Sequence, residues 1–132
     1  MKTYNVSLLV ESSSLSLDEL SLKLGRPHSS GSHAKGEAHR GGSAWPKTVW
    51  RFDSGVSDKA PVQEHLENLK AQFPPGELRA LVPAECAVYI DIVIFFDTVN
   101  VSLSIPRPGM EIVDSYDAAL EVTSYPVEEK KS

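Results

Sequence analysis

The strongest constraint on the fold of this chain is the alternation of side chains between residues 86 and 96. Successive side chains of a β-strand point to opposite faces of its sheet. One face of this segment is apolar at every second position, with Cys86, Val88, Ile90, Ile92, Ile94 and Phe96. The residues between them are mixed, with Ala87, Tyr89, Asp91, Val93 and Phe95. The segment therefore predicts a strand with one core face and one face of a different character.

Shorter patterns predict the other elements. Alternation predicts strands over residues 4–10, 48–53, 101–105 and 120–125, the third folding back as a hairpin through turn residues 97–100. A capping box, Ser16 and Glu19, predicts a helix over 17–24 that stops at Gly25. Apolar residues at helical spacing predict an amphipathic helix over 61–73, and residues 116–120 suggest a short helix.

This order of elements indicates the α+β class. We expect a two-layer sandwich, with a largely antiparallel or mixed sheet of about five strands and two main helices on one face. Residues 1–132 are expected to form a single domain. Within it, residues 27–42 are expected to be a flexible loop rich in Gly, Ser and His, and residues 126–132 a frayed tail.

Composition excludes several classes of protein. No apolar run reaches the roughly 20 residues of a membrane-spanning helix, and the first residues do not resemble a signal peptide. The formal charge of −5 disfavours unspecific binding to nucleic acid or to anionic membrane. The single cysteine, Cys86, excludes an internal disulfide and suits a reducing compartment. We therefore expect a cytoplasmic protein.

The order of pieces resembles a known family. The segment 17–25, then Lys35-Gly36 and Arg40-Gly41-Gly42 leading into Trp50-Arg51-Phe52, then the helix from Pro61 and the strand from Cys86, are similar to the bacterial family called domain of unknown function 4279 (DUF4279). The similarity spans residues 4–125, although the closing segment is shorter than that family's. The resemblance implies a small bacterial α+β domain without an assigned activity, and it supplies no catalytic residues.

The histidine-containing loop carries residue types found in metal and phosphate sites. His28, His33, His39 and Glu37 offer metal-binding atoms, but their spacing matches no standard zinc site. Arg26, Lys35 and Arg40 lie among glycines, yet neither a dinucleotide fingerprint nor a Walker pattern is present. A basic surface for an acidic protein fits these cations equally well. We expect no metal ion and no cofactor.

His65 is a candidate acid-base residue. His65 could pair with Asp53 or Asp91 as an acid-base couple, but no activated nucleophile accompanies it. A helix-flank histidine is therefore the simpler interpretation, and no catalytic residue is predicted.

Arg51 and Asp91, on the mixed face of the sheet, would form a cross-strand ion pair if their strands are neighbours. Alternatively, part of this face binds a partner. The candidate binding residues are Arg51, Tyr89, Asp91, Phe95, Lys35 and Arg40.

Small size, acidic charge and the missing catalytic pattern favour a non-catalytic protein-interaction module, with an immunity-type neutraliser of a toxin as one form of it. Its partner would be a protein, and the chain would be a monomer or a homodimer. The alternatives are a single-stranded RNA-binding or small-ligand-binding domain, or a small metal-dependent enzyme.

Overall fold

The computed structural model describes residues 2–37, 44–97 and 102–127 of the chain. Within these residues it contains four strands and four helices. In chain order they are β1 (Lys2–Ser12), α1 (Leu17–Leu24), β2 (Thr48–Asp53), α2 (Val62–Gln72), α3 (Pro75–Leu81), β3 (Ala87–Phe96), α4 (Arg107–Ser115) and β4 (Ala119–Pro126). This content confirms the α+β class.

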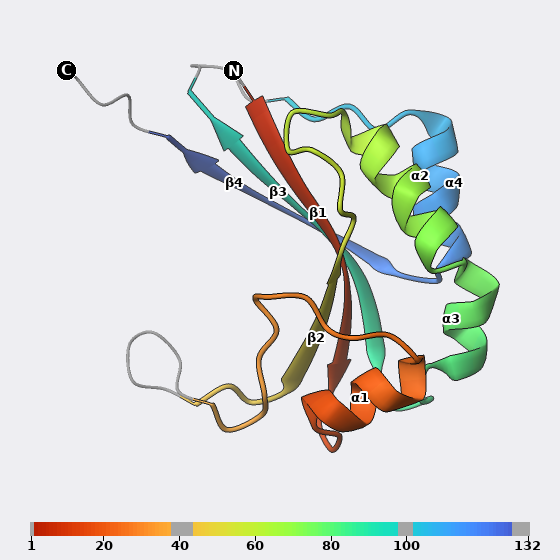
Figure 1. Ribbon diagram of the computed structural model, residues 1–132. Coiled ribbons are helices and arrows are strands. Elements are labelled where there is room, and N and C mark those ends of the chain that lie inside the picture. The colour runs from red at the N-terminus through yellow and green to blue at the C-terminus, as the bar shows by residue number, and fades with distance from the viewer. Residues whose placement is uncertain (1, 38–43, 98–101, 128–132) are drawn as a thin grey trace.

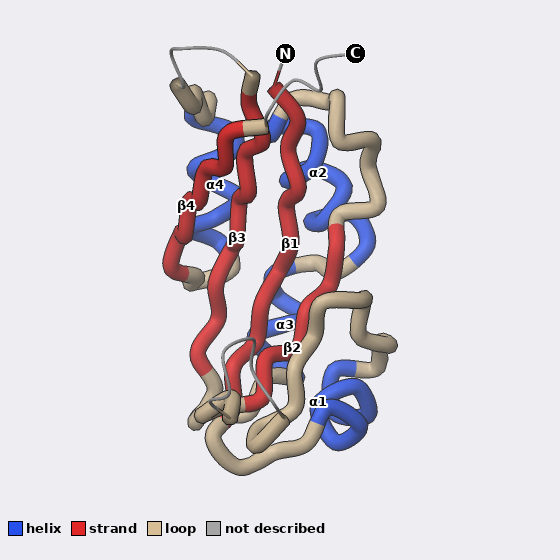
Figure 2. Tube along the Cα trace, turned by 90° about the vertical axis from the view of Figure 1, so that its left-hand side faces the viewer, coloured by secondary structure: helices blue, strands red, loops and turns tan. Residues whose placement is uncertain are grey.

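The strands form one mixed sheet in the order β2-β1-β3-β4. Strand β1 pairs antiparallel with both β2 and β3, whereas β4 lies parallel to β3. All the helices lie on one face of the sheet (Figure 1), and the opposite face is turned to the viewer in Figure 2. The prediction of helices on a single face is confirmed, with α3 and α4 added to the two main helices.

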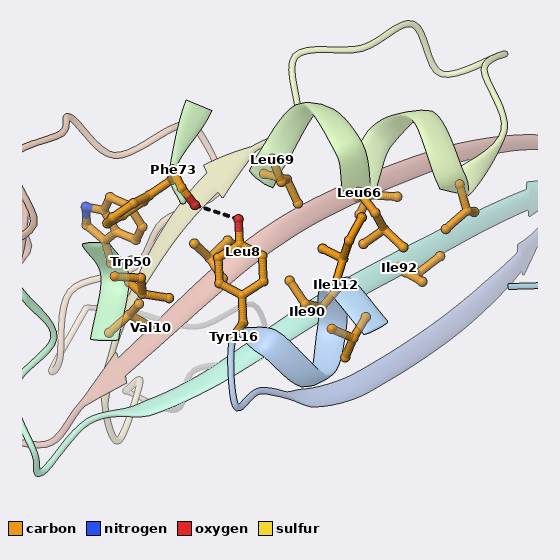
Figure 3. Packing of buried hydrophobic residues seen from close by; sticks show 14 of the residues in the cluster. Leu8, Val10, Trp50, Leu66, Leu69, Phe73, Ile90, Ile92, Ile112 and Tyr116 are labelled. Carbon is orange, nitrogen blue, oxygen red and sulfur yellow. Dashed lines mark hydrogen bonds between the residues drawn. The ribbon is translucent and has the colours of Figure 1, made fainter. Parts of the chain in front are cut away.

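The hydrophobic core fills the space between the helices and the sheet. Its strand residues include Leu8, Val10, Trp50, Ile90 and Ile92, which all lie on the helix-covered face. Figure 3 shows Tyr116, next to α4, reaching across this layer, where its hydroxyl donates a hydrogen bond of 2.6 Å to the carbonyl oxygen of Phe73. Burial raises the pKa of Tyr116 far above its ordinary value. The hydrogen bond to Phe73 gives the hydroxyl of this buried side chain a partner.

The last third of the chain differs from the prediction. Residues 102–105 form no strand, so the predicted hairpin is wrong and the described sheet has four strands, not about five. Pro106 and Pro108 lie at the start of α4, where a missing N–H costs no intrahelical bond, so they are compatible with the first turn of a helix. The short helix predicted over 116–120 lies earlier, as α4, while the predicted final strand is confirmed as β4. Because β3 and β4 are parallel, a crossover must join them, and α4 lies in it.

The described part of the loop after α1 is hydrogen-bonded to the sheet. Residues 28–33 follow the outer edge of β2, where His33 and Val49 exchange two backbone hydrogen bonds. Ser29 N–H donates to the carbonyl of Arg51, and the Ser29 and Ser32 hydroxyls accept from the amides of Asp53 and Arg51. The backbone and hydroxyl groups of these residues therefore satisfy the edge of β2, while the expected flexibility of residues 27–42 stays a prediction. Residues 38–42 lie outside the described part.

At the C-terminal end, the amide of Val127 donates to the carbonyl of Phe96 at 2.7 Å and continues the ladder past β4. Of the predicted frayed tail, residues 128–132 lie outside the described residues. None of the described helices combines the length and the apolar composition that crossing a bilayer requires.

Candidate functional site

The helix-free face of the sheet gathers four of the predicted site residues. Register places Arg51 and Tyr89 on either side of Leu9, and Asp91 beside Ser7, on the same face as Phe95. Tyr89 and Phe95 are partly exposed. Asp91 is only 7% exposed, so it is buried and cannot act as a surface contact.

Arg51 bridges the central strand of the sheet. Because β1 lies between β2 and β3, Arg51 and Asp91 are not on neighbouring strands, and the arginine reaches over Ser7 to place Nη2 3.3 Å from Asp91 Oδ2. Its Nη1 donates to Ser7 Oγ at 2.9 Å, and that hydroxyl donates to Asp53 Oδ1 at 2.6 Å. The predicted ion pair is confirmed, but it spans three strands, and it engages both Arg51 and Asp91 inside the protein.

Two hollows flank Arg51 on this face. One, of about 650 Å³, is lined by Ser7, Asp53, His65 and part of the loop, and the other, of about 240 Å³, by Tyr89, Asp91 and Glu121. Gly31 separates the loop from Arg51 by its lack of a side chain, since a Cβ there would lie 3.2 Å from Arg51 Nε. Arg51 Nε is buried and has no hydrogen-bond partner among the described residues.

The far end of the same face is aromatic. The rings of Phe95 in β3 and Tyr125 in β4 stack with their centroids 5.8 Å apart, and Tyr125 is 51% exposed. A small hollow of about 160 Å³ lies beside Phe95, Phe96 and Val127. The end of the sheet therefore presents an accessible aromatic pair.

Acidic side chains surround Tyr89 at the middle of the face. The charge of Glu11 is the largest cause that raises the pKa of Tyr89, followed by burial, and the charge of Glu121 adds to it. Glu121 is exposed and Glu11 is partly exposed. The electrostatic character of this part of the face is therefore negative.

The two described cations of the expected basic loop surface, Arg26 and Lys35, do not lie together. Arg26 stacks over the Phe73 ring at 3.6 Å, pairs with Glu77 at 3.1 Å and donates to the carbonyl of Gln72, so it ties α1 to α2 and α3. Lys35 is exposed, and its ammonium donates to the Ser13 carbonyl. Arg40, also a predicted binding residue, lies outside the described residues.

The two described loop histidines, His28 and His33, have separate partners. His33 stacks on Trp45 with ring centroids 4.1 Å apart, His28 contacts Ser21, and His39 lies outside the described residues. Within residues 2–37, 44–97 and 102–127, no group of three His, Cys, Asp or Glu side chains is arranged to hold a metal ion.

His65 belongs to a polar latch, defined here as Ser54 with its three α2 partners. His65 Nδ1 lies 2.6 Å from Ser54 Oγ, and the side-chain amides of Asn68 and Gln72 both donate to the Ser54 carbonyl. Helical spacing puts these three residues on one stripe of α2. His65 and Ser54 are both buried. Burial is the largest cause that lowers the pKa of His65, opposed by the backbone carbonyls of Ala60 and Ser57. The predicted partners Asp53 and Asp91 do not contact it, and the latch fastens α2 to the end of β2.

Sequence reasoning missed Ser7, Ser54, Glu11 and Tyr125 as members of these groups. Ser7 and Ser54 are ordinary serines in sequence, and only strand order and the approach of α2 give them their roles. The alternation of residues 120–125 did place Tyr125 and Glu121 on one face, which was the available signal for that pair.

Comparison with known proteins gives no relative. No protein-family model matches the chain, and no curated protein and no solved structure matches it significantly. The similarity to the DUF4279 family therefore stays a prediction.

The Arg51–Asp91 pair predicts a specific loss of stability. The two side chains are only 24% and 10% exposed, and Arg51→Met leaves the Asp91 carboxylate without its cation. We expect the free energy of unfolding to fall by about 2 kcal/mol, less than for a fully buried pair because solvent still reaches Arg51. Adding Asp91→Asn should recover part of that loss, because no buried charge remains.

Urea denaturation of the three proteins measures this difference. Arg107→Met is the matched control, because it breaks an ion pair to Glu111 whose side chains are 91% and 68% exposed, and it should change stability little. Equal losses from Arg51→Met and Arg107→Met would contradict a structural role for the spanning pair.

The latch predicts a pH dependence of stability. Because burial lowers the pKa of folded His65 below its ordinary value of 6.5, the unfolded chain takes up a proton that the folded protein resists. The stabilising contribution is therefore complete above pH 6.5 and is lost as the pH falls through that value towards the folded pKa. His65→Gln should be less stable than the unchanged protein at pH 8, and the gap should narrow towards pH 5. Thermal unfolding across this range tests it, with the exposed His28→Gln as control, and a constant gap would refute it.

Proposed function

We propose that the protein is a non-catalytic protein-interaction module that binds its partner through the helix-free face of the sheet. The observation that supports this proposal is the accessible Phe95–Tyr125 pair on a face that the helices leave uncovered (Figure 2). Aromatic side chains bury large areas at little entropic cost and are favoured anchors at protein interfaces. Tyr89 lies on the same face and extends the contact surface towards Leu9.

The charge of this face favours a cationic partner. Glu11 and Glu121 flank Tyr89, and the whole chain carries −5. Of the three cations expected to attract an acidic partner, the two that the structure describes, Arg26 and Lys35, contact other parts of the fold. An acidic surface speeds encounter with a basic protein and disfavours acidic ones. The sequence-based expectation of an acidic partner is therefore replaced by that of a basic one. A small acidic module that covers a basic toxin, as an immunity protein does, is one form of this function.

The resemblance to the DUF4279 family and the lone cysteine support a bacterial protein that acts in the cytoplasm. Cys86 is partly buried near the start of β3, and burial raises its pKa above the ordinary value, which disfavours the reactive thiolate. The negative face argues against the alternative of single-stranded RNA, which an aromatic sheet surface could otherwise stack.

Affinity capture tests the proposed face. Tyr125→Asp adds a charge beside Phe95 on an exposed side chain, so it should abolish capture of the partner without unfolding the protein. Leu22→Asp is the matched control, because Leu22 is 84% exposed on α1 and lies away from this face. Binding should also weaken as salt rises. If the two variants and the unchanged protein retain the same partner equally, this face is not the contact surface.

A small-ligand site is the second candidate function, and one observation favours it. The larger hollow beside Arg51 contains a buried guanidinium N–H, at Nε, that has no partner among the described residues. This N–H can donate a hydrogen bond to a ligand oxygen, and the flanking Ser7 and Ser54 hydroxyls add polar contacts.

Thermal unfolding in the presence of small carboxylates and neutral amides tests this second candidate. A ligand of this hollow should raise the melting temperature in a concentration-dependent manner. Ser30→Tyr, which fills the hollow from the loop, should remove the shift, whereas Leu22→Tyr should keep it. No shift with either class of compound would exclude small oxyacids and amides from this hollow.

A further inference from the structure

The two edges of the sheet differ in whether their outward backbone groups form hydrogen bonds. The edge of β2 is closed by the chain itself, because residues 29–33 bond to the outward N–H and C=O groups of Val49 and Arg51 and to the N–H of Asp53. Strand β4 is the opposite edge. In the described part of the chain, no hydrogen bond is formed with its outer side.

The alternation of the backbone identifies the unsatisfied groups. The amide of Val127 bonds to Phe96 in β3, so Val127 and the odd-numbered residues before it turn their N–H and C=O groups towards β3. Leu120, Val122 and Ser124 therefore turn theirs outward. Pro126 also turns outward, where its lack of an N–H costs no bond within the sheet.

Strand β4 lacks most of the features that keep an edge strand from pairing. It is eight residues long, carries no lysine, and has Pro126 only at its end. All its residues except Leu120 are exposed, and Val122 is 47% exposed on the side where Ile92 of β3 enters the core. A long exposed edge with one charged side chain is a template for another strand.

We propose that β4 pairs antiparallel with β4 of a second copy of this chain, around a two-fold axis at Val122. In this register Val122 lies opposite its own copy, and Leu120 lies opposite Ser124 of the second copy, so all three outward N–H groups find a carbonyl. An axis at Ser124 would instead place Val122 opposite Pro126, which has no N–H to donate. The register at Val122 is thus the one that uses the whole edge.

Charge and apolar contacts agree with a second copy as the occupant. Glu121, which is the charged residue of β4, lies opposite the neutral Thr123 of the second copy, so no like charges face each other. The two Val122 side chains meet on the helix side of the sheet and remove each other from water. The product is one continuous sheet whose two helix-free faces lie on the same side, consistent with closed two-fold assembly. This inference does not depend on the proposed partner of that face.

Sedimentation equilibrium up to millimolar protein tests the pairing. The unchanged protein should have the mass of two chains, and Val122→Lys should have the mass of one, because an inward-facing pair of lysines would repel. Leu22→Lys is the matched control and should remain dimeric, since Leu22 is 84% exposed on α1. Ser124→Pro is a second variant that removes one outward N–H and leaves the bonds to β3 intact, and it should also be monomeric.

Amide hydrogen exchange provides an independent measurement. In the dimer, the amides of Leu120, Val122 and Ser124 should exchange slowly, and in folded Val122→Lys they should exchange fast. The proposal is overturned if the unchanged protein is monomeric at millimolar concentration, if both edge variants stay dimeric, or if these three amides exchange fast in a dimer. Loss of partner capture by Tyr125→Asp with dimerisation intact would concern the proposed function alone.

Discussion

The fold depends on the double pairing of β1. This strand is antiparallel to β2 on one side and to β3 on the other, and Val6 to Val10 are buried on both faces. On the helix side its residues enter the core, and on the other side Ser7 lies beneath the Arg51 side chain. Because β1 separates β2 from β3, the ion pair between Arg51 and Asp91 can form only across it. The same strand therefore anchors the core and organises the polar face.

Two buried polar interactions hold helices in place on the sheet. The latch at Ser54 fastens α2 to the end of β2, and Tyr116 fastens the end of α4 to Phe73. Each satisfies a buried polar group that would otherwise cost free energy on leaving water. Serine and histidine are common residue types in catalytic sites, yet here the Ser54 hydroxyl and His65 Nδ1 are hydrogen-bonded to each other. The exposed part of the helix-free face is instead aromatic and acidic.

The two edges of the sheet, β2 and β4, differ in whether the chain itself covers them. Residues 29–33, which belong to a segment without large apolar side chains, cover the edge of β2 through hydrogen bonds. The edge of β4 is therefore the one where another strand can add. Strand β4 also contributes Tyr125 to the aromatic pair. Self-pairing at this edge and partner binding on the face would thus use two sides of the same strand without competing for the same backbone groups.

Local patterns in the sequence determined much of the fold. The alternation from Cys86 to Phe96 predicted β3 and its two faces, the capping box of Ser16 and Glu19 predicted the start of α1, and the faces carrying Arg51, Tyr89 and Phe95 followed from period two. The alternation of residues 101–105 wrongly predicted a strand, because an irregular segment can show the same five-residue pattern. Leu103 and Ile105 of this segment pack against the core without a strand. Only the tertiary structure decided strand order, the burial of Asp91 and the partners of Ser54, since each depends on contacts between residues far apart in the chain. Backbone hydrogen bonds have no side-chain signature, which is why the pairing of residues 29–33 with β2 and the open edge of β4 could not be derived from residue types.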